Sequence, residues 1–291
     1  MTTWAIIYNP TSGSFRQNRL EAVGDILRGQ GIHATLLATE RGGHATELAR
    51  SVEGVDCILS HGGDGTLNEV ANGMLGREVP LGFLPGGTAN AMAFELGLPR
   101  NPVRAIHRLL EMRPEPVHPG MVGDRAFMLM AGFGFDAQAV YMVKGAVKAR
   151  LGAMAYLAMG VRALFHPKPL LTVTLPDGGT SHGVWVVGSR GRRYGGMFFI
   201  HPRAALNAAE LGVTVVSKAM IAPFAFTHLL LGHGWRGGGI AMPTAGEFHV
   251  VAQQPVPVHV DGDHLGHGTS FRVSQSAQAI NFLFSPKNGR K

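Results

Sequence analysis

The chain has 291 residues, of which 45% are apolar and 15% are charged. At roughly 150 residues per domain, this length predicts two domains or one large domain. The composition excludes a disordered chain, which needs low hydrophobicity and high net charge, and the single Cys57 excludes a disulfide framework and a cysteine-built zinc site. The 26 Lys and Arg residues outnumber the 19 Asp and Glu residues, so the net charge of +7 favours an anionic partner.

The first third of the chain alternates short apolar runs with amphipathic stretches. We expect strands at residues 4–8, 32–38, 55–60 and 81–84, and helices at residues 14–30, 43–51, 67–75, 88–96 and 101–112. Ser14, Thr66 and Thr88 are placed to cap three of these helices. Strands that alternate with helices predict a doubly wound α/β domain, in which helices cover both faces of a parallel sheet.

The composition changes at RPEPVHPG, residues 113–120, whose three prolines and one glycine are typical of a linker. Beyond it we expect strands at residues 126–131, 170–175, 183–188, 213–217, 247–252, 256–260 and 279–284, with a helical interruption at residues 137–165. Turn signals such as Asp177-Gly178-Gly179 separate these strands. The second part of the chain is therefore predicted to be an antiparallel β domain.

Two glycine-rich turns follow predicted strands of the first domain, HGGDGTLNE at residues 61–69 and LPGGTANAMA at residues 84–93. Each leads directly into a predicted helix. Glycines let the backbone approach phosphate oxygens, and a helix N-terminus adds unpaired N–H groups and a partial positive charge. Open α/β sheets bind their ligands at the carboxyl ends of strands, where both turns lie.

Each turn alone also fits an ordinary helix start, because glycine followed by threonine is common there. Asp64 favours a functional role for the first turn, since a carboxylate lies beside phosphate groups only where Mg²⁺ separates them. The chain has no GxxxxGK[ST] motif, which excludes a P-loop protein, and no GxGxxG on a strand–helix turn.

Six motifs in this order make the chain resemble the diacylglycerol kinase-like lipid kinases, a family that includes sphingosine kinases and bacterial lipid kinases. The motifs are NPTSG at residues 9–13, GGDGT at 62–66, PGGTAN at 85–90, AGFGFDA at 131–137, RYGGM at 193–197 and VDGD at 260–263. They span nearly the whole chain. GGDGT alone also resembles NAD kinases and phosphofructokinases, whereas the ordered set is highly specific.

The resemblance implies an α/β nucleotide-binding domain at residues 1–114, joined by the C-terminal residues 277–291, and a β-sandwich lipid-substrate domain at residues 120–276. It implies an ATP-dependent and Mg²⁺-dependent kinase that phosphorylates a lipid hydroxyl group. With the second glycine turn included, the expected nucleotide-binding residues are Asn9, Thr39, Gly62, Gly63, Asp64, Gly65, Thr66, Leu67, Asn68, Gly86, Gly87, Thr88 and Asn90.

The family's DGE motif supplies its proposed general base, and Asp263 holds that position here. Asp261 is expected to orient Asp263 or to bind metal, and Asp64 to lie near the Mg²⁺ of Mg–ATP. Without the other motifs, Asp261-Gly262-Asp263 is better explained as a hairpin turn, because Asp-Gly is a strong turn signal.

The sequence departs from the family pattern in three places. Asp263 is one methylene shorter than glutamate, which moves the base back by roughly 1.5 Å unless the backbone compensates. Ala91 follows GTAN where many members have aspartate. The family often binds a structural Mg²⁺ in a DDG-containing loop, but the corresponding residues 206–212 carry Ala208, so we expect no complete site there, with Asn207 and Glu210 as the remaining candidates.

Several alternatives remain open from the sequence. An NAD kinase-like phosphotransferase with a soluble acceptor shares the first-domain turns, and the aspartate at position 263 leaves room for a catalytically weak nucleotide- or lipid-binding homologue. His264 and His267 form a candidate zinc cluster, against which solvated loop histidines are the simpler explanation. No recognition module supports a nucleic-acid partner.

The expected location is the cytoplasm, with peripheral contact to the inner face of the membrane. The longest uncharged apolar-rich stretch, residues 219–235, has only 17 residues and is interrupted by Pro223 and two glycines, which suits a membrane span poorly. Residues 139–168 mix apolar and basic side chains and fit either an anionic bilayer or a helix packed on the sandwich. The sequence leaves the oligomeric state open, a homodimer included.

Overall fold

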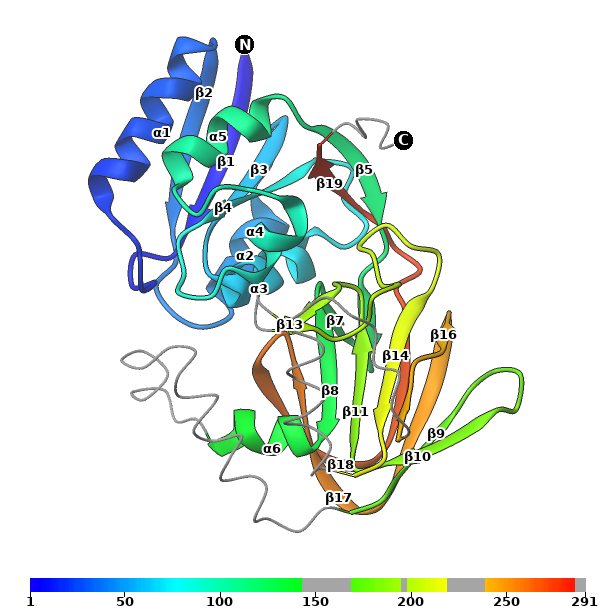
Figure 1. Ribbon diagram of the computed structural model, residues 1–291. Helices are drawn as coiled ribbons and strands as arrows, with labels where there is room; N and C mark the ends of the chain where they lie inside the picture. Colours follow the sequence, from blue (N-terminus) through cyan, green and yellow to red (C-terminus); the bar gives the residue numbers. More distant parts are fainter. Residues whose placement is uncertain (143–168, 195–197, 219–238, 286–291) are drawn as a thin grey trace. The chain divides into compact units, whose positions relative to one another are not determined.

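A computed structural model describes residues 1–142, 169–194, 198–218 and 239–285 (Figure 1). The chain divides into two compact units. Unit 1 contains Met1–His118 together with the chain from Ala277 onward, and unit 2 contains Pro119–Ser276. Most of the predicted helical interruption and of the basic amphipathic stretch, from residue 143 on, lies outside the described residues.

Unit 1 is an α/β domain, as predicted. Its sheet has the strand order β2-β1-β3-β4-β19-β5, and the first four strands are parallel. The strands are β1 (Thr2–Tyr8), β2 (Ile32–Ala38), β3 (Cys57–Gly62), β4 (Leu81–Pro85), β5 (Arg113–Val117) and β19 (Ile280–Phe284). The helices are α1 (Gln17–Gly29), α2 (His44–Ser51), α3 (Asp64–Met74), α4 (Ala91–Leu96) and α5 (Pro102–Leu110).

The order in which the chain adds strands to this sheet reverses between β1 and β3, although the strands themselves stay parallel. From β1 the chain crosses to β2 on one side, and from β3 it crosses to β4 on the other side. Because such crossovers are right-handed, α1 covers one face of the sheet while α2 and α3 cover the other. The helices pair accordingly, with α1 against α5 and α2 against α3. Ligands of open α/β sheets bind at the carboxyl ends of strands beside such a reversal.

Three predicted helix caps are wrong. Helix α1 begins at Gln17 with Arg16 as its N-cap, α3 begins at Asp64 after Gly63, and α4 begins at Ala91 after Asn90, and none of these three caps forms a side-chain capping hydrogen bond. Sequence spacing alone could not exclude the predicted residues as caps: Ser14 and Thr88 take part in contacts between loops, and Thr66 lies inside α3. The helix predicted at residues 101–112 is confirmed as α5, and the Asn101 side chain, for which no cap was predicted, accepts the Val103 N–H at its start.

The predicted linker at residues 113–120 is also wrong, because Arg113–Val117 forms β5, antiparallel to β19. This strand lies at the end of the sheet. Pro114 and Pro116 are two residues apart, so the positions of their missing N–H groups point to the same side, away from β19. An edge strand tolerates proline when that side carries no partner strand. The prolines therefore mark an edge strand and not a break in structure.

Unit 2 is an antiparallel β-sandwich, as the family resemblance implied. Its strands are β6 (Gly120–Val122), β7 (Arg125–Phe127), β8 (Met130–Gly134), β9 (Leu171–Thr174), β10 (Thr180–Gly183), β11 (Trp185–Ser189), β12 (Arg193–Tyr194), β13 (Phe198–Phe199), β14 (Leu211–Val216), β15 (Ile240–Ala241), β16 (Thr244–Ala245), β17 (Glu247–Val260) and β18 (Asp263–Gln275). The single strand predicted at residues 126–131 is two strands, β7 and β8, and α6 (Phe135–Met142) follows β8.

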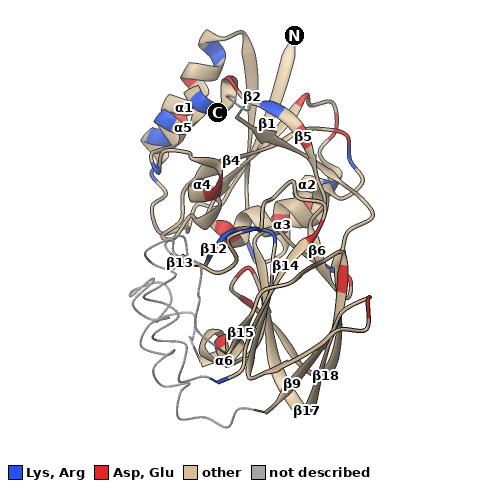
Figure 2. Cartoon of the chain, turned by 45° about the vertical axis from the view of Figure 1, so that its right-hand side comes forward, with Lys and Arg blue, Asp and Glu red and all other residues tan. Residues whose placement is uncertain are grey.

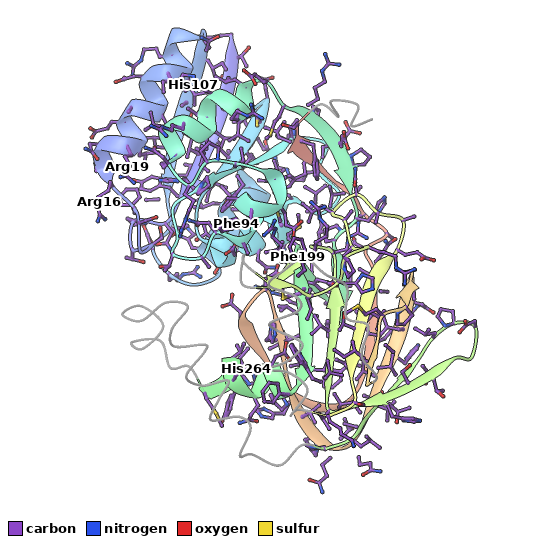
Figure 3. The ribbon with its side chains drawn as sticks, viewed as in Figure 1. Arg16, Arg19, Phe94, His107, Phe199 and His264 are labelled. Carbon is purple, nitrogen blue, oxygen red and sulfur yellow. The ribbon has the colours of Figure 1, made fainter. Side chains whose placement is uncertain are left out.

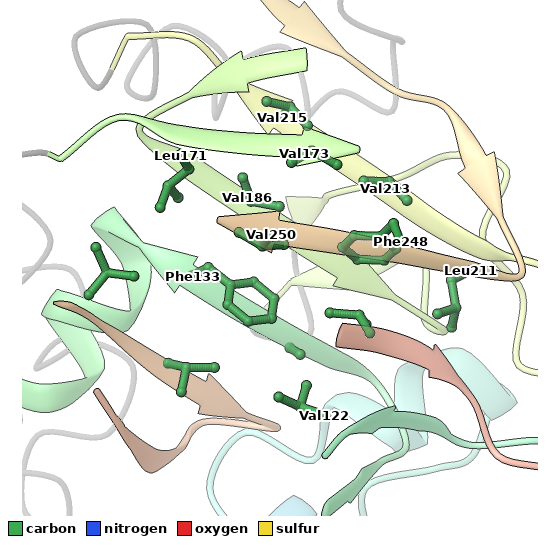
Figure 4. Packing of buried hydrophobic residues seen from close by; sticks show 14 of the residues in the cluster. Val122, Phe133, Leu171, Val173, Val186, Leu211, Val213, Val215, Phe248 and Val250 are labelled. Carbon is green, nitrogen blue, oxygen red and sulfur yellow. The ribbon is translucent and has the colours of Figure 1, made fainter. Parts of the chain in front are cut away.

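The core of unit 2 is apolar and well buried (Figure 4). Phe133 of β8 and Phe248 and Val250 of β17 lie among the valines of β11 and β14. The two strands predicted at residues 247–252 and 256–260 are halves of β17, joined across an irregularity in its pairing with β18. The first half also pairs with β9 and the second with β8, so β17 connects two regions of the sandwich.

Strand β18 was not predicted. Only Val273 among its thirteen residues is buried, so the strand lacks the apolar alternation by which strands are found in a sequence. It exists because it pairs with β17 along nearly its whole length. His264 and His267, expected in a solvated loop, lie on this strand. Among the helices of the described residues, none combines the length and the apolar character needed to cross a bilayer.

Candidate active site

The predicted nucleotide-binding residues gather at one edge of the unit 1 sheet. Asn9 follows β1, Thr39 follows β2, Gly62–Asn68 spans the end of β3 and the start of α3, and Gly86–Asn90 follows β4. The strand ends are joined by backbone hydrogen bonds, from Asn9 N to His61 O at 3.0 Å and from Thr39 N to Tyr8 O at 2.8 Å. All four segments thus lie at the carboxyl ends of adjacent parallel strands, beside the reversal between β1 and β3.

The two glycine turns are in direct backbone contact. Gly86 N donates to Gly62 O at 2.7 Å. A Cβ atom on Gly87 would overlap the Cα atom of Gly63, whereas a Cβ on Gly63 would lie at an ordinary 3.4 Å from Gly87. At Gly87, therefore, glycine is required so that the two turns can touch, independently of any bound phosphate.

The NPTSG segment and the serine that follows it hold the second turn through two side-chain hydrogen bonds. Ser12 Oγ donates to Gly86 O and Ser14 Oγ donates to Gly87 O, both at 2.9 Å. Asn9 Oδ1 accepts the Thr11 N–H and hydroxyl, which closes the NPTSG turn on itself. Ser14 thus joins two loops and is not a helix cap, a long-range role that no local sequence pattern indicates.

Asn90 completes the second turn from within. Its backbone is in the left-handed region, with φ at 52°, which asparagine tolerates better than most residues. Its side chain is buried and pairs with both backbone groups of Gly87, accepting from the N–H and donating to the carbonyl at 2.8 Å each. Asn90 therefore shapes the turn, while Thr88, which is exposed, keeps its hydroxyl at the surface of the turn.

Asp64 links the two turns electrostatically. Its carboxylate oxygens accept the N–H groups of Ala91 at 2.9 Å and Met92 at 3.0 Å, which are the first two residues of α4. Burial raises the pKa of Asp64 above its ordinary value, and these amide hydrogen bonds oppose the rise. The N-terminus of α4 is therefore already occupied by a carboxylate, which leaves that of α3, where no side chain caps the helix, as the end suited to phosphate.

The donor set of Asp64 fits a Mg²⁺ ligand. The side chain is a carboxylate, the ligand type that a hard cation prefers. Its oxygens accept the backbone amides of Ala91 and Met92 and also hydrogen-bond the backbone of Asp64 and Asn90.

Two arginines line a pocket of about 380 Å³ beside these turns, together with Gly13, Gly87 and Thr88. Arg19 comes from the N-terminal end of α1 (Figure 3), and Arg100 lies in the segment before α5, where its guanidinium donates to Thr88 O. Basic residues continue along α1 and α5 (Figure 2). The pocket thus combines positive charge with glycine backbone, which is the chemistry of an anion site.

His61 lies directly before the first turn and is buried. Its Nδ1 is 3.1 Å from the carbonyl oxygen of Leu84, so Nδ1 carries the proton, and burial lowers the pKa of the imidazole below its ordinary value. His61 is therefore a neutral core residue that joins β3 to β4.

Of the three aspartates predicted for catalysis, Asp261 and Asp263 belong to unit 2, at a two-residue hairpin between β17 and β18. Val260 pairs with Asp263, and Asp261 and Gly262 form the turn with φ values of 47° and 84°. Positive φ at both positions is typical of the type I′ turn that Asp-Gly favours. Asp263 is the first residue of β18.

The Asp261 carboxylate is held by three consecutive backbone amides. It accepts the N–H groups of Met128 at 2.7 Å, Leu129 at 2.9 Å and Met130 at 2.8 Å, from the segment between β7 and β8. Asp261 N in turn donates to Met130 O at 2.8 Å. These contacts fix the hairpin to the sandwich and suit Asp261 to positioning its neighbour Asp263.

The loop at residues 206–212 does not fit a structural metal. The guanidinium of Arg190, buried at 1% exposure, donates to the carbonyl oxygens of Leu206 and, at 3.5 Å, Glu210. Burial lowers the pKa of Arg190 to about 10, so the side chain is still a cation at neutral pH. A positive group thus already contacts two carbonyl oxygens of this loop, which disfavours a second cation there, and the side chain of Ala208 offers no ligand.

The His264 and His267 rings pack at 5.0 Å from each other and at 4.8 and 5.0 Å from the exposed Tyr141 of α6. Figure 3 shows His264 near α6. Within the described parts of the chain, no three metal-ligating side chains come together, so the zinc alternative finds no support there. Burial and the neighbouring His267 lower the pKa of His264, which favours the neutral form of this imidazole.

Comparison with known proteins finds a matching family model for each of the two units. Residues 3–122 match the family described as "Diacylglycerol kinase catalytic domain", and residues 130–283 match "YegS C-terminal NAD kinase beta sandwich-like domain". The diacylglycerol kinase of Bacillus subtilis is 30% identical over 90% of this chain and 89% of its own length. A protein of Chromohalobacter salexigens named "Probable lipid kinase YegS-like" is 34% identical over 96% of this chain and 91% of its own.

Solved structures share the fold. A diacylglycerol kinase structure from Bacillus anthracis str. Sterne has a TM-score of 0.77 at 21% identity and covers 98% of this chain and 97% of that one. With both units matched in order and a relative of 34% identity along nearly the whole length, the chain belongs to the diacylglycerol kinase-like lipid kinase family.

Proposed function

We propose that the protein transfers the γ-phosphoryl group of ATP to a hydroxyl group of a diacylglycerol-like or sphingoid lipid. The observation that carries this proposal is the convergence of the NPTSG, GGDGT and PGGTAN segments at one sheet edge, beside a pocket lined by Arg19 and Arg100. An anionic, phosphate-bearing ligand suits this combination of glycine backbone and guanidinium groups. Membership of a lipid kinase family supports the lipid as acceptor.

On the donor side, unit 1 binds and neutralises the triphosphate. The N–H groups at the start of α3 and the hydroxyl of Thr88 are suited to phosphate oxygens, and the two arginines to the charge that accumulates during transfer. Asp64 would hold Mg²⁺, which neutralises charge on the phosphates when it is bound. Catalysis by these residues rests on positioning and electrostatics.

On the acceptor side, unit 2 supplies the proton acceptor. The lipid hydroxyl oxygen bonds to the γ-phosphorus, the bond from that phosphorus to the bridging oxygen of ADP breaks, and the hydroxyl proton moves to the Asp263 carboxylate. Since the acceptor is a lipid, the protein has to reach a membrane surface, and we propose the inner face of the cytoplasmic membrane.

The experiment is a transfer assay with γ-labelled ATP and Mg²⁺ against a panel of lipids in mixed micelles, with Asp263→Asn as the matched variant. We expect label in one lipid class, a loss of most turnover in Asp263→Asn, and unchanged ATP binding by that variant. Asp263→Glu tests whether the missing methylene limits the rate, by up to about 10²-fold for a 1 Å displacement.

The result also separates the alternatives. Transfer to a soluble acceptor but to no lipid would favour the NAD kinase-like alternative. ATP binding without transfer to any acceptor, together with an inactive Asp263→Glu variant, would favour a binding protein and contradict the proposal.

A further inference from the structure

A buried acid–imidazole pair lies behind the hairpin of unit 2. His259 Nε2 of β17 and Asp136 Oδ2, at the start of α6, are 3.0 Å apart, and the two side chains are 2% and 4% exposed. Asp136 Oδ1 accepts the N–H of Ala137 at 2.7 Å. Burying such a pair costs desolvation free energy unless its hydrogen bonds are complete. We therefore expect the pair to have a function.

The hydrogen bonds fix the tautomer of His259. The Gly262 N–H donates to Nδ1 at 3.3 Å, so Nδ1 is the unprotonated nitrogen. Nε2 therefore carries the proton and donates it to Asp136. The contacts form one chain from Asp136 through the ring to the backbone N–H of Gly262, the residue directly before Asp263.

The fold keeps space for this pair. His259 lies opposite Gly132 of β8 in the sheet register. A Cβ atom on Gly132 would overlap both the Asp136 carboxylate and the His259 ring. Gly132 and Asp136 both belong to the AGFGFDA segment, so that segment, which the proposed chemistry does not otherwise use, contributes the space and the acid.

We propose that His259, oriented by Asp136, is a positioning residue that fixes the Gly262 peptide and thereby the Asp263 carboxylate. The inference rests on the proposed function of Asp263 as proton acceptor. The hairpin then has two tethers, Asp261 on the amides of residues 128–130 and Gly262 on the imidazole. Together with the pairing of Val260 with Asp263, the two tethers hold both turn residues and so help to set the position of the first residue of β18.

Two amide variants separate the two ends of the imidazole. His259→Asn places an acceptor oxygen near the position of Nδ1 but cannot reach Asp136, whereas His259→Gln places a donor near the position of Nε2 and removes the Nδ1 atom that accepts the Gly262 N–H. If His259 positions the hairpin, His259→Gln lowers kcat by about 10²-fold and leaves the KM for ATP unchanged, while His259→Asn stays within about tenfold of the wild type. Urea unfolding of both variants measures the stability that each loses.

A second readout is independent of catalysis. Hydrogen exchange of the Gly262 amide is expected to be slow in the wild type and in His259→Asn, and fast in His259→Gln. Wild-type protein that transfers no phosphate but shows this exchange pattern would overturn the proposed function while leaving the tether intact. Equal exchange rates in the two variants, or kcat losses that follow only their losses of stability, would overturn the positioning role itself.

Discussion

The two units build their parts of the candidate site by different means. In unit 1 the backbone builds it: Gly62 and Gly63 lie against Gly86 and Gly87, and Ser12 and Ser14 hold carbonyl oxygens of the second turn. In unit 2 side chains build it, because the Asp261 carboxylate and the His259 ring hold the backbone of a two-residue hairpin. A site made of backbone depends on the absence of side chains, and a site held by side chains depends on partners distant in sequence.

This difference predicts opposite sensitivities. The unit 1 turns should be sensitive to a methyl group at Gly87, where the turns touch, and should tolerate the loss of single polar groups. The unit 2 hairpin should be most sensitive to the loss of the Asp261 carboxylate.

The largest expected effect is that of Asp261→Ala. The change leaves three backbone amides of residues 128–130 without an acceptor and places alanine at a φ of 47°. At about 1 kcal/mol or more for each unsatisfied buried amide, we expect a loss of about 3 kcal/mol in the free energy of unfolding. Urea unfolding, followed by a signal from unit 2 such as the fluorescence of Trp185, measures it. The neighbouring Asp263→Asn serves as control; if it costs as much stability as Asp261→Ala, the tether is not specific to Asp261.

A smaller effect is expected of Gly87→Ala in unit 1. Its methyl group overlaps the Cα atom of Gly63, so the two turns must separate, at a cost of about 1–3 kcal/mol. Gly63→Ala adds the same methyl group to the other side of the contact, where the nearest atom is at 3.4 Å, and should leave stability close to that of the wild type.

ATP binding provides a second comparison of the Gly63 and Gly87 variants. Titration with ATP should show weakened binding in both glycine variants, because the Cβ of Gly63→Ala still obstructs a phosphate that approaches the turn. Normal ATP affinity in a folded Gly63→Ala protein would show that phosphate does not approach the first turn at Gly63.

The smallest expected effect is that of Mg²⁺ on the protein without nucleotide. Because Arg190 already donates to the carbonyl oxygens of Leu206 and Glu210, neither 10 mM Mg²⁺ nor EDTA should change the Tm of unit 2. Arg190→Met removes the competing charge, and a Kd near 1 mM for Mg²⁺ would then stabilise the variant by about 1.4 kcal/mol. The exposed Arg192 provides the control Arg192→Met, and a Tm of the wild type that falls in EDTA would contradict the assignment.

Local patterns were sufficient for part of the fold. The alternation of apolar strands and amphipathic helices in residues 1–112 predicted the parallel sheet, because each of those strands is apolar enough to be recognised alone. The two halves of β17 were found for the same reason, since Phe248, Val250 and Ala252 alternate with exposed residues. By contrast, β18 has one buried side chain and β5 has two prolines, so neither looks like a strand until its partner is known.

The candidate site, like the fold, could be predicted from the sequence only in part. Glycine turns after strands and the Asp-Gly turn were visible in the sequence because their conformation is a property of a few adjacent residues. Ser14, expected as a helix cap, contacts Gly87, and Asp64 reaches the start of α4 across 27 positions. His259 and Asp136 lie 123 positions apart, and neither was selected as a site residue.

By itself, then, the sequence determined which residues can turn, cap, bury or carry charge, and its ordered motifs identified the family. Only the tertiary structure decided which of those capacities is used, because a hydrogen bond between distant segments depends on where the sheet places them. The Asp261 carboxylate could equally have faced solvent or a cation. It accepts three amides because the pairing of β17 with β8 brings residues 128–130 to it, and no local pattern encodes that pairing.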